Sequence, residues 1–76
     1  MKLKTGNIMK TLDSHHRVII KCDIPGERID LVTIIEWKGY YTVGTSPRRT
    51  LRKYSKQDVI DFLDENSMYI ETWKAW

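Results

Sequence analysis

The chain has 76 residues, of which 41% are hydrophobic and 30% charged, and it carries a formal net charge of +3. That composition excludes a disordered tail, and because so short a chain buries only about 60% of its unfolded surface, it leaves little room for a buried active site. Its one cysteine cannot form an internal disulfide and its N-terminus lacks an apolar stretch of signal-peptide length, so we expect a single domain over residues 1–76 in the cytoplasm.

The first predicted element is a short helix from Thr5 to Asp13, because Ile8, Met9 and Leu12 fall on one helical face. A strand is the alternative, since the glycine in this segment is a poor helix former. Residues 13–16 are typical of a turn, and we expect the two adjacent histidines in it to be exposed.

Two strands are predicted next. Residues 17–22 have the density of β-branched side chains typical of a strand, and residues 24–26 contain a proline and a glycine suited to a type II turn. The segment Ile29 to Trp37 is apolar on both faces, which favours a central position in the sheet.

A hairpin is predicted at residues 38–39, which connect this strand to another over residues 40–43. The hairpin places Trp37 opposite Tyr40 as a cross-strand aromatic pair. Such a pair is most often a packing contact, with recognition as the alternative role.

Positive charge is concentrated in the middle of the chain. Residues 37–57 contain six lysines and arginines and no acid, whereas residues 58–76 contain five acids and one lysine. Five of the six cations fall between Arg48 and Lys56, and we call residues 48–56 the basic segment. Its charge marks it as the candidate place for a partner to dock.

Two geometries are open for residues 47–54. A helix capped by Ser46 would gather the cations into one stripe, but it would place arginines at the positive end of the helix dipole. A strand after a turn at residues 44–47 is favoured. In that strand Arg48, Arg52 and Tyr54 share the face that we expect to meet a partner, while Leu51 points inward between cations that guard a sheet edge.

The clearest helix begins after Ser55, which forms a capping box with Asp58. An apolar stripe follows, and the acids lie opposite it. Residues 66–67 are suited to end the helix, and residues 68–73 are predicted as a returning strand, with a second short helix as the alternative. These elements predict an α+β fold: an antiparallel sheet of three to five strands with a short N-terminal helix and an amphipathic helix near the C-terminus.

The expected function is binding without catalysis. A small module that docks on an acidic surface of another protein or on a nucleoprotein complex is the first hypothesis, and nucleic-acid binding through phosphate contacts and tyrosine stacking is the second. A homodimer through basic–acidic pairing is a further expectation, and no membrane partner is expected. The candidate partner-binding residues are Arg48, Arg49, Arg52, Lys53, Tyr54, Lys56, Tyr40 and Tyr41.

No motif points to a reaction or to a bound cofactor. Asp13, His15, His16, Cys22 and Asp23 include every type of zinc ligand, but adjacent histidines on an extended chain point to opposite sides and no CxxC or HExxH pattern is present. No nucleophile elbow or phosphate-binding glycine loop occurs. We therefore expect no catalytic residue, no metal and no cofactor.

Two resemblances are visible. The predicted order of a short helix, three strands and a closing helix preceded by cations resembles the double-stranded-RNA-binding domain. However, residues 54–58 offer one lysine followed by an acid, where that family has a lysine-rich stretch, so none of its binding residues is transferred. In size and style the chain resembles small accessory proteins of phages and prophages. That resemblance implies an inhibitor or modulator of a host protein.

Overall fold

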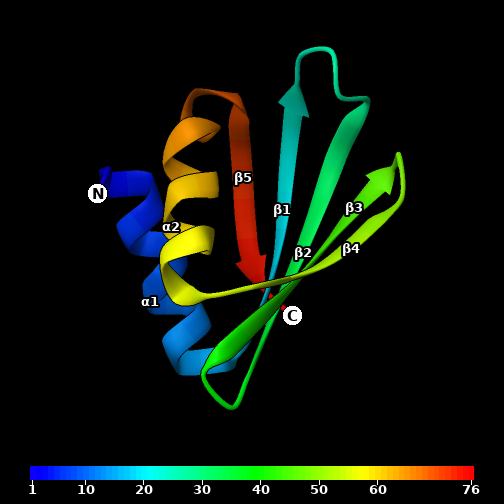
Figure 1. The fold of residues 1–76 in the computed structure, drawn as a ribbon. Helices are drawn as coiled ribbons and strands as arrows, with labels where there is room; N and C mark the ends of the chain where they lie inside the picture. The colour runs from blue at the N-terminus through cyan, green and yellow to red at the C-terminus, as the bar shows by residue number, and fades with distance from the viewer.

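The computed structural model describes residues 1–76 as a five-stranded antiparallel sheet with two helices on one of its faces (Figure 1). The predicted α+β class is confirmed. The elements in chain order are α1 (Leu3–His15), β1 (Arg17–Ile24), β2 (Ile29–Trp37), β3 (Tyr40–Pro47), β4 (Thr50–Tyr54), α2 (Lys56–Glu65), the 3-10 helix η1 (Ser67–Tyr69) and β5 (Ile70–Ala75). Neither helix is long and apolar enough to cross a membrane.

The strand order is β4-β3-β2-β1-β5. The apolar segment that forms β2 therefore lies at the centre, as predicted, and β4 and β5 are the edges. Helix α1 packs against β1, β2 and β5, whereas α2 packs against β3 and β4. The core lies between the helices and the sheet, and its fully buried members include Ile8, Leu12, Ile20, Ile34 and Leu63.

Helix α1 is longer at both ends than the predicted Thr5–Asp13 helix. At its start, the backbone N–H of Lys2 donates to a carboxylate oxygen of Asp64 at 3.0 Å, and Lys4 Nζ donates to two carbonyls near η1. At its end, His16 takes a left-handed conformation with φ 65° and its N–H donates to the Leu12 carbonyl. The predicted turn at residues 13–16 was wrong, because residues 13–15 belong to α1 and only His16 lies between α1 and β1.

The predicted turn at residues 44–47 was also wrong, because these residues continue β3. The turn is instead Arg48-Arg49. Thr45 Oγ1 donates to the Arg48 carbonyl at 2.6 Å and accepts from the Thr50 N–H at 3.1 Å, so one threonine side chain stabilises both sides of the turn. In the C-terminal segment, both alternatives hold in part, since η1 occupies residues 67–69 and β5 begins at Ile70.

The capping box before α2 is confirmed. Ser55 Oγ accepts from the Asp58 N–H at 3.1 Å, and Asp58 accepts from the Ser55 N–H at 3.2 Å. We expect Ser55→Ala to lower the free energy of unfolding by about 1 kcal/mol, because it removes the acceptor for a helix N–H. Urea unfolding measures this loss. Ser14→Ala is the control, since Ser14 is exposed and caps no helix; an equal loss there would contradict the capping role.

Candidate binding surface

The sheet face opposite the helices is covered by no other element (Figure 1). Along each strand, buried residues face the helices and alternate with half-buried or exposed residues that face outward. We call the outward side the open face. Its residues are Arg17, Ile19, Lys21 and Asp23 of β1; Leu31, Thr33, Ile35 and Trp37 of β2; Tyr40, Thr42, Gly44 and Ser46 of β3; Leu51 and Lys53 of β4; and Thr72 and Lys74 of β5.

The open face is cationic. Four of its residues are lysine or arginine, and one, Asp23 near the β1–β2 turn, is acidic. Acids gather near the β1–β2 turn, where burial and the charges of Asp30, Glu71 and Asp23 together raise the pKa of the Cys22 thiol. The open face is therefore positive over most of its area and acidic at the end near the β1–β2 turn.

Aromatic rings accompany these cations. Lys53 Nζ lies 3.9 Å from the centroid of the Tyr40 ring, Lys38 Nζ lies 5.4 Å from the Trp37 ring, and the Arg17 guanidinium lies 5.4 Å from the ring of Trp76, which follows β5. Each distance is within the range of a cation–π contact. The structure contains three such contacts, and all three involve residues of the open face or directly adjacent to it.

The three contacts lie at the same end of the sheet. Arg17, Ile35, Thr42 and Lys53 form one cross-strand row, and Trp37 pairs with Tyr40 in the next row toward the β2–β3 turn. Neighbouring strands are about 4.8 Å apart, so the row from Arg17 to Lys53 spans about 14 Å. We call this end of the open face, with Trp37, Lys38 and Trp76, the aromatic end.

The structure separates the candidate residues of the basic segment. Lys53 and Tyr40 meet on the open face. Leu51 also lies there and is 76% exposed, so the expectation that it points inward was wrong. Its neighbours Arg52 and Tyr54 lie on the helix side, because the register alternates about Leu51. Lys56 is exposed at the start of α2.

Tyr41 is not accessible. Its side chain is 4% exposed in the core, where burial, followed by the charges of Asp13 and Glu36, raises the pKa of the phenol. A partner docking on either face of the sheet therefore does not meet its ring. Without Tyr41, the accessible candidate residues are Tyr40, Arg48, Arg49, Arg52, Lys53, Tyr54 and Lys56.

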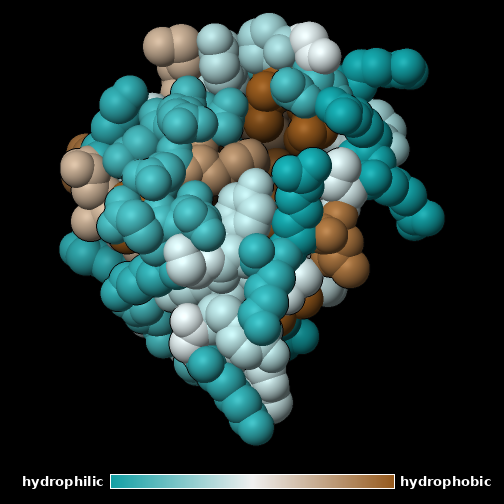
Figure 2. Space-filling model, in the orientation of Figure 1, coloured by the Kyte–Doolittle hydropathy of each residue, from teal (hydrophilic) through white to brown (hydrophobic).

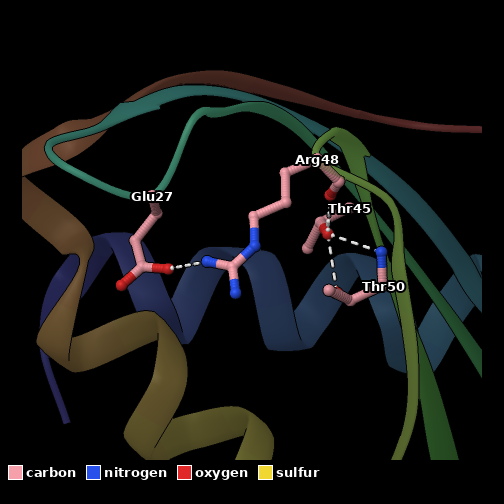
Figure 3. Close-up of polar contacts among 4 residues, drawn as sticks. All are labelled: Glu27, Thr45, Arg48 and Thr50. Atoms are coloured by element: carbon pink, nitrogen blue, oxygen red, sulfur yellow. Dashed lines mark hydrogen bonds and ion pairs between the residues drawn. The ribbon is translucent and has the colours of Figure 1, made fainter.

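Arg48 already has a partner within the chain. Its guanidinium donates to a carboxylate oxygen of Glu27 at 2.7 Å and joins the β3–β4 turn to the β1–β2 turn (Figure 3). Both side chains are more than half exposed, so the pair contributes little to stability. Arg49, beside it in the turn, is exposed and has no carboxylate within 4.0 Å.

A hollow of about 430 Å³ lies on the helix side, between α2 and the strands β3 and β4. Figure 2 shows hydrophobic atoms at its base, between the hydrophilic surface of α2 and the β3–β4 hairpin. Its lining includes Arg48 and Arg52 but also Glu27 and Glu65. Because two arginines and two glutamates line this hollow, its charge favours neither an anionic nor a cationic ligand.

Arg17, Lys38 and Trp76 of the aromatic end were absent from the sequence-based set of binding residues, whereas Trp37 was considered for recognition beside Tyr40. The alternation of Arg17, Ile19 and Lys21 was a readable signal for one polar strand face. The approach of Trp76 to Arg17 was not readable, since it depends on the pairing of β1 with β5, more than fifty residues later in the chain.

No group of three or more histidine, cysteine or acidic side chains is arranged to hold a metal ion. Cys22 is a free thiol buried on β1. Comparison with protein families, with curated proteins and with solved structures finds no match to this chain.

Proposed function

We propose that the protein binds single-stranded nucleic acid on the open face. The observation that carries the proposal is that one uncovered sheet face holds four cations and a single acid, Asp23, while all three cation–π contacts lie at its aromatic end, away from that acid. Cations attract the phosphates of a nucleic acid, and unstacked bases can stack on exposed aromatic rings. The function is binding, with no catalytic step.

The exposure of the rings favours a single strand over a duplex. Trp37 is 59% exposed and Trp76 is 52% exposed, so their faces are available for a base to stack on. A duplex keeps its bases stacked on one another, and the open face presents no helix to enter its major groove. A row of about 14 Å across the sheet is long enough for two or three nucleotides.

The proposal predicts salt-dependent binding to an unstructured oligonucleotide. A labelled oligothymidylate titrated with the protein at about 50 mM salt should bind, and the logarithm of the association constant should fall with the logarithm of salt concentration by about 0.7 per phosphate contact. Fluorescence anisotropy measures both quantities. A duplex of equal length is the comparison. Absence of binding at low salt, or tighter binding of the duplex, would exclude the proposed function.

A further inference from the structure

Strand β4 is an unpaired edge. It pairs with β3 through five residues, from Thr50 opposite Thr45 to Tyr54 opposite Tyr41, and no strand lies on its other side. Alternate residues of an edge strand point their N–H and C=O groups outward, where another extended chain can pair with them. The other edge, β5, differs in that its exposed charges have mixed sign, Glu71 and Lys74.

Cations that form no salt bridge lie along the β4 edge. Arg49, Arg52, Lys53 and Lys56 are all exposed, and no carboxylate lies within 4.0 Å of any of their charged nitrogens. Leu51, between them, is 76% exposed. Lysines on an edge discourage pairing with a copy of the same strand, since like charges then face each other. The same charges attract an extended chain that is acidic.

We propose that β4 binds an extended acidic segment of another protein, which adds to the sheet as a sixth strand. Main-chain hydrogen bonds supply the affinity of such an added strand, and alternate side chains supply the specificity. This proposal goes beyond the proposed function, because it uses the edge of the sheet and its main chain. The two sites share Leu51 and Lys53.

The two sides of β4 predict the pattern of the bound segment. On the open face the added strand meets Leu51 and Lys53, whose Nζ lies against the Tyr40 ring and has no carboxylate within 4.0 Å. On the helix side it meets Arg52, but Asp58, Asp61 and Glu65 line the same hollow. Acidic side chains of the partner therefore belong on the open-face side and uncharged ones on the helix side. The partner segment should carry an acid at every second position over about five residues.

The test uses a synthetic peptide of alternating glutamate and threonine with the intact protein. Hydrogen exchange followed by NMR should show slower exchange of outward N–H groups in residues 50–54 when the peptide is added. A peptide with the same composition but its glutamates in one block should bind at least about tenfold more weakly. A peptide N-methylated along one edge should not bind, because it cannot form the ladder. Equal binding of all three peptides, or no slowing in β4, would overturn the proposal.

A charge variant separates this site from the open face. Arg49→Gln, Arg52→Gln and Lys56→Gln combined should weaken the alternating peptide at least about tenfold and leave oligothymidylate binding within about twofold. Slow exchange in β4 that depends on protein concentration without peptide would show that a second copy occupies the edge, and that result would overturn the proposal. The peptide can fail to bind while the oligonucleotide binds, and the reverse, so the two proposals fail independently.

Discussion

Ile34→Ala is expected to lower the free energy of unfolding by about 2–5 kcal/mol, because it removes most of a buried side chain and leaves a cavity. Ile34 is fully buried at the centre of the central strand, where it pairs with Val18 on β1 and Val43 on β3. A domain of this size has a total stability of about 4–11 kcal/mol. The substitution therefore removes a large part of it, and urea unfolding monitored by tryptophan fluorescence measures the loss.

Ile35→Ala is the matched control. Ile35 is the next residue on the same strand and has the same side chain, but it lies on the open face and is half-buried. Its loss of free energy should be about 1 kcal/mol, since less apolar surface returns to water and no closed cavity forms. Equal losses at both positions would contradict the open face, because they would require Ile35 to be buried by a second layer or a second copy.

Local patterns predicted most of the fold for a physical reason. Three predicted features each depend on residues within a few positions of one another. They are the apolar stripe of α2, the capping box at Ser55 and the hairpin between Trp37 and Tyr40. The start of α1 could not be predicted in the same way. Its first turn is held by Asp64, more than sixty residues away, which supplies the capping oxygen that the sequence around Lys2 lacks.

The candidate site was predicted only in part. Successive residues of a strand point to opposite faces, so Tyr40 and Tyr41 lie on opposite faces of β3. This rule, applied to the sequence, would have removed Tyr41 from the candidate binding residues. Leu51 was placed inward because apolar residues usually are, yet register is set by β3, whose buried Val43 pairs with Arg52. Leu51, next to Arg52, therefore faces away from the helices.

The second large effect concerns the aromatic end. We expect Trp37→Ala to weaken oligothymidylate binding by about fivefold to 150-fold, which corresponds to about 1–3 kcal/mol for one lost stacking contact. Trp37 is 59% exposed and outside the core, so the variant should stay folded. The salt slope should not change, because no charge is removed. Lys53→Gln should show the complementary result, a slope smaller by about 0.7.

Met68→Ala is the control for both variants. Met68 is 75% exposed, but it belongs to η1 between α2 and β5 and not to the open face. Removal of an exposed apolar side chain there should leave both the affinity and the salt slope within error. If Met68→Ala weakens binding as much as Trp37→Ala, the oligonucleotide is held by general adhesion to exposed apolar groups. If Trp37→Ala leaves the affinity unchanged while Lys53→Gln lowers the salt slope, phosphates alone are bound, and the aromatic end has no part in recognition.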